Sequence, residues 1–240
     1  KMATVNVVQI FGTVDPAKVN DYTEYMAAVN MYEALTTLDS SGSIKPLLAE
    51  SWDVSADTLT YTFKLKSGAS FQDGSPVEAK DVVYSVNRLL ALNEGPSYLF
   101  EGVLDENSVS AVGNDKVEFK LKKVYTPFLT YTPILFVVNS DVAEANKASS
   151  DPWAQDFIAN NTIGAGAFKM TNWERGATMT MERYKGYHLV WGRDAIDNER
   201  YVVTNEDANV KALAASGELS MSSDAQAQET YESIGKMDNY

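Results

Sequence analysis

An alternating strand followed closely by an amphipathic helix is the feature that most constrains the fold of this chain. Along residues 58–66, large apolar side chains alternate with threonines and lysines, which predicts a strand with one buried and one exposed face. Asp73-Gly74 predicts a tight turn, and Ser75-Pro76 leads from it into a helical segment. Within residues 79–90, apolar side chains recur at the spacing i, i+4, i+7 and i+8, so this helix is expected to bury one stripe.

Further strands and helices are predicted on both sides of these elements. Residues 109–112 and 117–121 predict a β-hairpin. Residues 21–35 predict a helix with Tyr25, Ala28, Val29 and Tyr32 on its apolar face. The other expected elements are strands at 4–11, 134–138, 166–171, 179–183, 200–204 and 219–221, a short helix at 141–146, a helix capped by Asn205 and ended by Gly217, and a weak helix near 226–234. Because strands come early as hairpins and later alternate with helices, the predicted class is mixed α/β (α+β).

The net charge and the absence of cysteine exclude several partners and kinds of chemistry. The formal net charge of −13 repels phosphate, so nucleic acid and anionic membranes are not expected partners. With no cysteine, disulfides, thiolate catalysis and cysteine metal sites are excluded. No apolar run reaches the roughly 18 residues that a membrane-spanning helix needs. The start at Lys1-Met2 carries no apolar signal core, so any export signal is expected to be processed or to lie outside this sequence.

Residues that could catalyse a reaction or bind a metal are isolated in the sequence. His188 is the single histidine, and we expect it to be structural or exposed. Gly164-x-Gly166 lacks the third glycine of a dinucleotide fingerprint, so close packing of a strand is the favoured interpretation. A glycosidase needs two carboxyl groups about 5–10 Å apart. The sequence places no such pair, although acids are plentiful: Asp53, Asp57, Asp73, Asp81, Asp105 and Glu106. We therefore expect no catalytic residue, no metal site and no cofactor.

Short motifs follow one another in a characteristic order along the chain. They are Tyr32-Glu33-Ala34-Leu35, Pro46-Leu47-Leu48-Ala49-Glu50-Ser51-Trp52, the alternating strand, Phe71-Gln72-Asp73-Gly74-Ser75-Pro76-Val77, the helix with Asp81-Val82 and Arg88-Leu89, Gly164-Ala165-Gly166-Ala167-Phe168, Asn172-Trp173, Ala212-Leu213 and Ser216-Gly217-Glu218-Leu219. The ordered set resembles the extracytoplasmic solute-binding proteins of peptide and nickel ABC transporters (family 5, the oligopeptide- and dipeptide-binding type). The resemblance covers residues 15 to about 221.

Two segments depart from the pattern of this family. Relatives usually carry an asparagine ahead of a Tyr-Trp pair, whereas this chain has a longer segment at 184–192 that contains Tyr187, His188 and Trp191. The family pattern therefore does not predict the conformation of this segment. After the equivalent of Gly217-Glu218, relatives commonly place an apolar residue and aspartate, whereas this chain has Leu219-Ser220.

The resemblance implies a lobe of the type II periplasmic-binding-protein fold with an inserted α+β subdomain. On that template, residues 1–37 and 163–240 form one discontinuous α/β domain, and residues 38–162 form the insertion. Members of the family are substantially longer and have a second lobe. The resemblance therefore also implies that this chain is an N-terminal fragment in which the second lobe, the opposite wall of the ligand cleft, is absent.

The resemblance also indicates where a solute would bind. The loop Asn20-Asp21-Tyr22 matches a segment that lines the cleft in this family, and Ser97-Tyr98-Leu99-Phe100 matches a loop that contributes an aromatic side chain to the pocket. The expected ligand-binding residues are Tyr98, Asp21, Tyr22, Asn20 and Phe100. The chain has 13 Tyr, 9 Phe and 4 Trp, and most of these rings are expected to pack in the core.

The implied function is reversible capture of a solute by two lobes that close on it through a hinge motion. The expected solute is an oligopeptide or dipeptide, with an oligosaccharide or chelated nickel as alternatives, and the expected partner is an ABC permease in the membrane. A monomer is implied, in the periplasm or another extracytoplasmic space and associated with the membrane through the permease. Two other functions stay open: a carbohydrate-active enzyme with a carboxylate pair, and a non-catalytic protein-interaction domain. This chain alone is expected to bind solute weakly or not at all, because half of the contacts and the closure step are missing.

Overall fold

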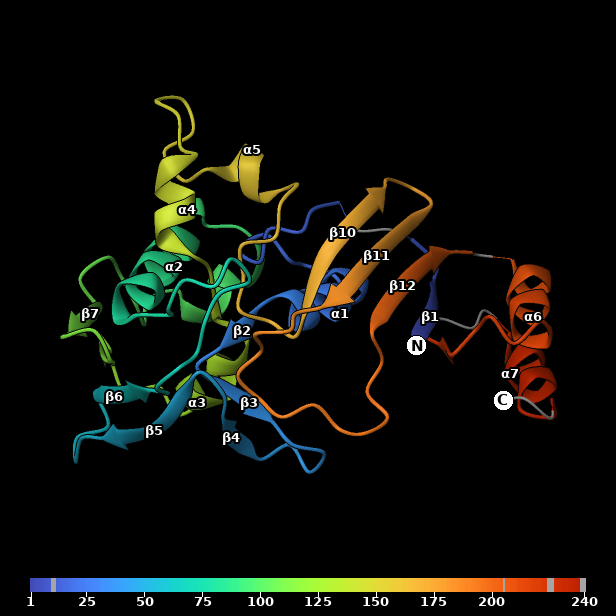
Figure 1. Ribbon diagram of the computed structural model, residues 1–240. Coiled ribbons are helices and arrows are strands. Elements are labelled where there is room, and N and C mark those ends of the chain that lie inside the picture. The colour runs from blue at the N-terminus through green and yellow to red at the C-terminus, as the bar shows by residue number, and fades with distance from the viewer. Residues whose placement is uncertain (10–11, 205, 224–226, 238–240) are drawn as a thin grey trace.

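The computed structural model describes residues 1–9, 12–204, 206–223 and 227–237, and within them two main sheets lie apart from one another (Figure 1). The larger sheet has five strands in the order β10-β11-β12-β1-β13. Its strands are β1 (Met2–Val7), β10 (Phe168–Glu174), β11 (Thr178–Arg183), β12 (Asn198–Val203) and β13 (Met221–Ser222). The first strand of the chain runs parallel to β12 and β13, whereas β10, β11 and β12 form an antiparallel meander. Segments from both ends of the chain therefore build this sheet.

The smaller main sheet has four antiparallel strands in the order β5-β6-β8-β7, and helix α2 (Ala79–Leu92) packs on it. Its strands are β5 (Ala49–Val54), β6 (Thr60–Leu65), β7 (Val109–Val112) and β8 (Lys116–Lys120). The predicted alternation is confirmed, because Tyr61, Phe63 and Leu65 are buried along β6. Helix α2 begins with a capping box between Glu78 and Asp81 and buries most of its predicted apolar stripe.

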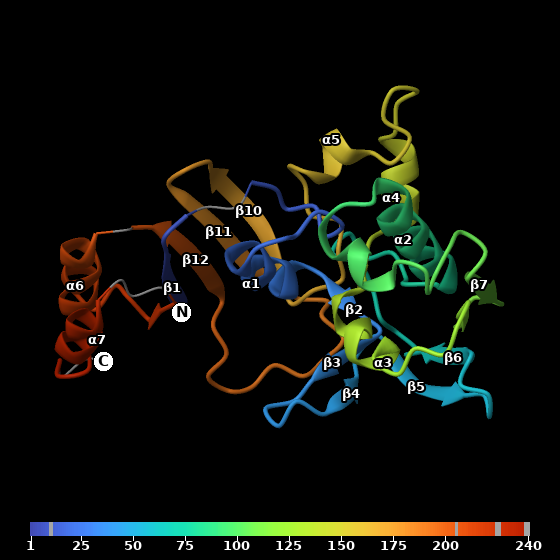
Figure 2. The same cartoon turned by 180° about the vertical axis from the view of Figure 1, so that it is seen from behind.

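Short ribbons and helices connect the two sheets, as the view from behind also shows (Figure 2). The ribbons are β2 (Glu33–Ala34) with β9 (Phe136–Val137), and β3 (Thr36–Leu38) with β4 (Ile44–Pro46). The helices are α1 (Tyr22–Met31), α3 (Phe128–Tyr131), α4 (Ser140–Ala145) and α5 (Gln155–Ile158), and the 3₁₀ helices are η1 (Gly95–Phe100) and η2 (Thr132–Ile134). A final pair, α6 (Asp207–Ala215) and α7 (Gln228–Ile234), lies at the edge of the molecule beside β1 and β12.

Most predicted elements are present, but the first helix is shorter than predicted. It ends at Met31 instead of continuing to residue 35, because Tyr32 has an extended backbone and the next two residues pair as β2. Its predicted apolar face is correct in part, because Ala28 and Tyr32 are 2% and 1% exposed. Tyr25 and Val29, by contrast, are 37% and 44% exposed, and the helix buries Ala27 and Met31 in their place. The predicted helix cap Asn205 and the predicted end of the first strand at residue 11 lie outside the described residues.

Two large hydrophobic cores occur among the described residues, one associated with each main sheet. The first lies between α2 and the four-stranded sheet and includes the contacting rings of Phe63 and Phe119. The second lies against the five-stranded sheet, where Met179 and Met181 are fully buried as predicted. Ile158, which comes from the expected insertion, packs in this second core. The expected insertion therefore contributes side chains to both cores.

Close backbone packing joins the start of β10 to the end of α1. The Gly166 amide donates to the Met31 carbonyl at 3.1 Å. Gln72, which is 7% exposed, donates from Nε2 to the carbonyl oxygens of Met31, Gly166 and Phe168 at 3.1, 3.1 and 2.7 Å. A Cβ atom on Gly166 would lie 2.4 Å from a carbonyl oxygen of α1. The interpretation of this glycine motif as a site of close strand packing is confirmed.

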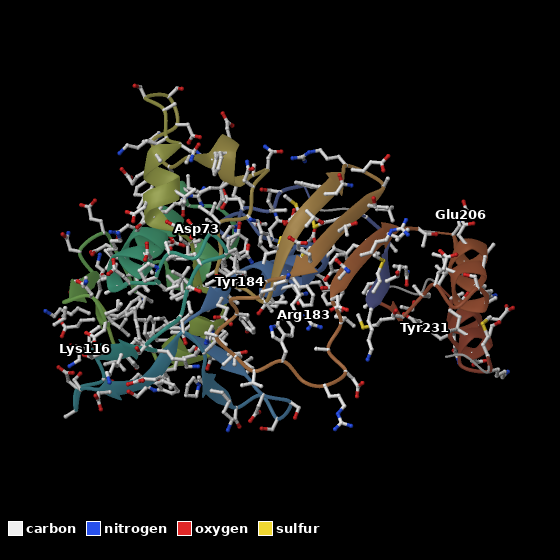
Figure 3. The ribbon with its side chains drawn as sticks, viewed as in Figure 1. Asp73, Lys116, Arg183, Tyr184, Glu206 and Tyr231 are labelled. Carbon is white, nitrogen blue, oxygen red and sulfur yellow. The ribbon has the colours of Figure 1, made fainter. Side chains whose placement is uncertain are left out.

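The segment between β11 and β12, whose conformation the sequence left open, is attached to β2 through a buried carboxylate. It starts after Arg183 with Tyr184, near the middle of the molecule (Figure 3). Glu33 accepts a hydrogen bond from the Tyr187 hydroxyl at 2.5 Å, and its other oxygen lies 2.6 Å from His188 Nε2. The side chains of His188 and Glu33 are each 3% exposed. The contact holds the imidazole ring against the Glu33 carboxylate of β2. His188 is therefore structural, one of the two roles that were expected for it.

We expect Glu33→Ala to reduce the free energy of unfolding by about 2–3 kcal/mol, because the half-buried Tyr187 hydroxyl and the buried His188 ring nitrogen both lose their partner. Burial and the Glu33 carboxylate raise the pKa of Tyr187 above its usual range, so its hydroxyl stays a donor at neutral pH. Urea denaturation of the chain would measure the loss. Glu50→Ala is the control, because Glu50 pairs with Lys64 on an exposed strand and should change stability by less than about 1 kcal/mol. Equal stabilities of the two variants would contradict the structural role of Glu33.

Candidate ligand-binding pocket

A pocket of about 350 Å³ opens where the loop before α1 meets η1 and the segment around η2 and β9. Its walls are mainly aromatic and aliphatic. The lining residues are Pro16, Val19, Asn20, Asp21, Tyr22, Tyr25, Gly95, Pro96, Tyr98, Leu99, Ile134 and Phe136. Its size and apolar character are typical of a small-molecule site, which usually holds a few placed polar groups.

The loop that carries Asn20 and Asp21 is fixed by two carboxylates at the start of α1. Asp21 is the N-cap, and its Oδ1 accepts from the Glu24 amide at 2.9 Å and from the Thr23 hydroxyl at 2.7 Å. Glu24 reaches back over the loop, where its two oxygens accept from the amides of Gly12 and Asn20 at 3.1 and 3.0 Å. Local side chain–backbone bonds therefore hold this wall of the pocket.

A buried ion pair also holds the loop before α1 in place. Both terminal nitrogens of Arg88 on α2 donate to the Asp15 carboxylate at 2.6 Å, and Arg88 Nε donates to the Trp153 carbonyl at 2.8 Å. The side chains of Arg88 and Asp15 are 1% and 0% exposed. Asp15 Oδ1 also accepts from the Ala17 amide at 3.0 Å. This pair therefore attaches α2 to the loop that leads into the pocket.

The opposite wall is η1, which packs directly on the loop. Gly95 has φ +49°, and a Cβ atom there would lie 2.6 Å from the Ala17 carbonyl oxygen and 2.9 Å from that of Val19. Only glycine permits this approach and this backbone conformation at low cost. The contact places Tyr98 at the mouth of the pocket with its side chain 69% exposed.

Four of the five predicted ligand-binding residues lie together in this lining, and Phe100 does not. Asn20, Asp21, Tyr22 and Tyr98 all line the pocket. The side chain of Phe100 is 0% exposed and packs edge-on against rings of the first core. In a 3₁₀ helix with three residues per turn, positions 98 and 100 point in different directions. Phe100 therefore supports η1 from the core and is not part of the pocket.

Sequence reasoning missed several lining residues. Tyr25 lies one turn after Tyr22 on the exposed face of α1, so its helical spacing from Tyr22 was a signal that could have found it. Ile134 and Phe136 come from a segment more than a hundred residues later in the chain, and the sequence showed only that this segment is buried. Their place in the pocket depends on the pairing of β9 with β2.

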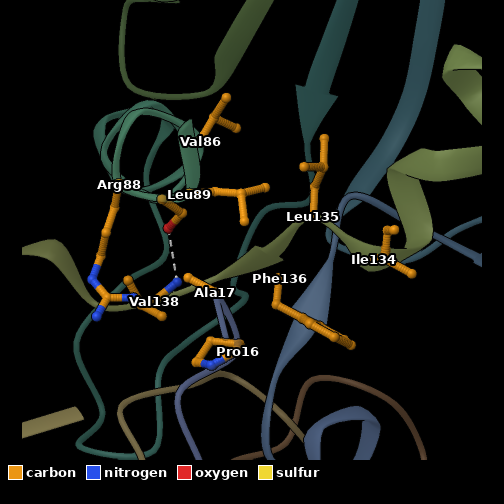
Figure 4. A pocket seen from close by; sticks show the side chains of 10 residues that line it. Pro16, Ala17, Val86, Arg88, Leu89, Ile134, Leu135, Phe136 and Val138 are labelled. Carbon is orange, nitrogen blue, oxygen red and sulfur yellow. Dashed lines mark hydrogen bonds between the residues drawn. The ribbon is translucent and has the colours of Figure 1, made fainter. Parts of the chain in front are cut away.

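A second and much smaller space lies next to the pocket (Figure 4). It is enclosed by Pro16, Ala17, α2 and β9, and its volume is about 10 Å³, enough for about one water molecule. The Ser85 hydroxyl accepts from the Val138 amide across it at 2.9 Å. This space is a gap in side-chain packing and not a solute site.

The described residues of the pocket do not form a catalytic or metal-binding arrangement. Among the described lining residues Asp21 is the one carboxylate, so they do not supply a pair of acids. Across the described part of the chain, no group of three or more His, Cys, Asp or Glu side chains is placed to hold a metal ion. Asp81 is buried, and burial raises its pKa, but its carboxylate accepts from the Ser140 amide at 3.0 Å and joins α2 to α4. The arrangement is suited to contact and hydrogen bonding.

Comparison with known proteins assigns the chain to a family. A family profile described as bacterial extracellular solute-binding proteins, family 5, middle region, matches residues 43–239. The chain belongs to this family. The expected resemblance is thereby confirmed, and members of the family are extracytoplasmic solute-binding proteins. None of the helices in the described ranges has the length and apolar character that crossing a bilayer requires.

Individual relatives agree with this assignment and differ from the chain in length. A "Probable D,D-dipeptide-binding periplasmic protein DdpA" of Escherichia coli K12 is 32% identical over 177 residues, which cover 70% of this chain and 33% of that protein. The structure of the oligopeptide-binding protein AppA from Bacillus subtilis, in complex with a nonapeptide, matches 100% of this chain and 46% of its own, with a TM-score of 0.88 and 23% identity. NikZ from Campylobacter jejuni in complex with Ni(L-His) matches with a TM-score of 0.80 and 21% identity over 92% of this chain and 43% of its own.

At these identities the structural matches establish the fold alone. The expected fold, a mixed α/β lobe of the type II periplasmic-binding-protein class, is confirmed. The chain spans about a third of the length of the curated relative and under half of the two solved chains. The length of these relatives agrees with the expectation that this chain corresponds to an N-terminal part of a longer receptor.

Proposed function

We propose that this chain is one lobe of the solute-binding component of an ABC importer and that it captures a peptide-like solute without altering it. The observation that carries the proposal is the pocket between Asn20-Asp21-Tyr22 and Tyr98, which is open on one side and lined by rings and backbone. Three tyrosines offer apolar faces and hydroxyl groups, a combination that suits peptide backbones of varied sequence. A second lobe would close the open side by a hinge motion. The receptor would act as an extracytoplasmic monomer that reaches the membrane by docking on its permease.

The proposal includes a division of the chain into two subdomains. Residues 38–162 would form the insertion, since the whole four-stranded sheet lies within them, and residues 1–37 with 163–240 would form the discontinuous domain that holds the five-stranded sheet. The loop with Asp21 would come from the first unit and Tyr98 from the other. The pocket would then lie between two packed units, a common place for ligand sites.

Other solutes and other functions are less well supported. The names of relatives include proteins for dipeptides and glutathione, and a nickel–histidine complex, so a chelated metal is a second candidate solute. An oligosaccharide could also stack on the tyrosines. A carbohydrate-active enzyme would need a second carboxylate beside Asp21, and the described lining does not supply one. Turnover of a chromogenic glycoside by the full-length protein would contradict the proposed non-catalytic role.

In the full-length receptor, Tyr98→Ala is expected to weaken binding of a peptide ligand about tenfold, equivalent to about 1.4 kcal/mol. The side chain is 69% exposed in the open pocket and would be covered by the solute, so truncation removes contact area without disturbing the core. The ligand should first be identified by native mass spectrometry of gently purified receptor, and its affinity then measured by calorimetry.

Tyr231→Ala provides the control for that measurement. Tyr231 is 46% exposed on α7 and does not line the pocket. Equal affinities of the Tyr98 and Tyr231 variants would rule out the pocket as the binding site. A full-length receptor that gains no thermal stability from any peptide, sugar or metal chelate would favour a protein-interaction domain instead.

A further inference from the structure

We infer that the pocket accepts a cationic group of the solute, an ammonium or guanidinium that lies against Asp21 and the faces of the surrounding tyrosines. This inference rests on the proposed function, because it concerns the solute that the same pocket would bind. It specifies the chemical class: a peptide with a lysine or arginine side chain placed beside the loop before α1.

The first reason is that the pocket carries negative charge without a basic residue to compensate it. Asp21 lines the pocket, and lysine, arginine and histidine are missing from the described lining. The nearest lysine in the loop, Lys18, is paired with Glu94 at 3.2 Å. Arg175 reaches the same loop, but its guanidinium donates to the Gly12 carbonyl and to Asn160 Oδ1, and it does not line the pocket.

A second carboxylate lies directly behind the first. Glu24 is 7% exposed, and its oxygens accept from the amides of Gly12 and Asn20 at 3.1 and 3.0 Å. Among the described residues, no lysine, arginine or histidine forms an ion pair with Glu24. The positive end of the α1 dipole, equivalent to about half a unit charge, offsets only part of the charge of two carboxylates. The loop therefore carries a net negative potential toward the pocket.

The Asp21 carboxylate has acceptor capacity left for a ligand. Oδ1 is occupied by the Thr23 hydroxyl and the Glu24 amide at 2.7 and 2.9 Å. Among the described residues, Oδ2 has one partner, the Gln9 side-chain amide at 3.3 Å. A carboxylate offers about four acceptor positions, so Oδ2 can accept from an incoming ammonium while Oδ1 continues to cap the helix.

The aromatic walls favour the same class of ligand. Tyr22 and Tyr98 are 60% and 69% exposed, and Tyr25 is 37% exposed, so ring surface is available around the carboxylate. A cation within about 6 Å of a tyrosine ring centroid is attracted to its face, and more strongly where it is partly desolvated. The net charge of −13 would also steer cations toward the molecule. An anionic group would meet only uncharged donors in the described lining, such as the Asn20 amide and the tyrosine hydroxyls.

The test compares three peptides that are matched in length and differ at one side chain. Alanyl-lysyl-alanine, its norleucine counterpart and its glutamate counterpart are titrated by calorimetry into the full-length receptor. We expect the lysine peptide to bind about tenfold more tightly than the norleucine peptide, equivalent to about 1.4 kcal/mol, and the glutamate peptide to bind most weakly. In Asp21→Asn, the preference for lysine over norleucine should fall to about twofold, because asparagine keeps the helix cap but removes the charge.

Asp53→Asn is the matched control, since it also removes one negative charge, but from an exposed residue of β5 that does not line the pocket. It should leave the lysine preference unchanged. Peptides that bind without a preference for lysine, or a preference that survives Asp21→Asn, would overturn this inference and leave the proposed function intact. A receptor that binds none of the three peptides, nor any other peptide, would overturn both.

Discussion

Replacing Arg88 with methionine is expected to reduce the free energy of unfolding of this chain by about 3–5 kcal/mol, the range for loss of one partner of a buried ion pair. The Arg88 and Asp15 side chains are 1% and 0% exposed, and two hydrogen bonds of 2.6 Å join them. Methionine fills a similar apolar volume but donates no hydrogen bond. The Asp15 carboxylate would then stay buried with the Ala17 amide as its one donor among the residues that the structure describes, and the Trp153 carbonyl would lose the Arg88 Nε donor. Urea denaturation monitored by circular dichroism measures the loss.

Two further variants separate the cost of the buried charge from a general effect of losing a basic residue. Lys122→Met removes a cation that pairs with Asp105 at 3.2 Å on the surface, where both side chains are about half exposed, and it should cost less than about 1 kcal/mol. The double variant Asp15→Asn, Arg88→Met removes both charges and keeps an oxygen for the Ala17 amide. It should be more stable than Arg88→Met alone. If the single and double variants unfold at the same urea concentration, an unpaired charge is not the source of the loss.

Local elements of this fold were predictable because their signals are short-range. The alternation along β6 and the stripe along α2 depend on residues two to four positions apart, and the structure buries the former as predicted and most of the latter. Long-range pairs were not predictable in this way. Arg88 and Asp15 are 73 residues apart, and His188 and Glu33 are 155 residues apart. No short-range pattern in the sequence links the two members of either pair.

The part of the candidate pocket that comes from two short continuous segments was predictable. Asn20, Asp21, Tyr22 and Tyr98 lie in two short segments that the family resemblance had indicated, and all four are in the lining. Phe100 was misplaced because the sequence does not show which side of η1 faces the core. The apolar face of α1 was predicted only in part for a related reason: Tyr25 was placed on the core face with Ala28 and Tyr32, although it borders the open pocket.

Replacing Gly166 with alanine is expected to destabilise the chain by at least about 3 kcal/mol, the upper part of the range for overpacking a core. An added Cβ atom would lie 2.4 Å from the Asn30 carbonyl oxygen and 2.6 Å from the Tyr32 amide nitrogen. These are backbone atoms, so a rotamer change cannot relieve the contact. The Tyr32 amide donates to the Ala28 carbonyl at 2.8 Å in the last turn of α1, and the Gly166 amide donates to Met31 at 3.1 Å. At least one of these two hydrogen bonds must lengthen to accommodate the added Cβ atom.

This displacement should also affect the pocket. The displaced residues form the end of α1, and Asp21 of the pocket lining is the N-cap of the same helix. In the Gly166→Ala variant we expect amide hydrogen exchange to increase along α1 and β2 together, since the two elements meet at Tyr32. Gly192→Ala is the matched control, because no atom lies within 4 Å of a Cβ there, and its stability should stay within about 0.5 kcal/mol of the parent chain. Similar unfolding midpoints for the two alanine variants would show that the backbones of α1 and β10 can separate at little cost. In that event, close contact at Gly166 would not be what fixes the position of α1 and of the pocket wall it carries.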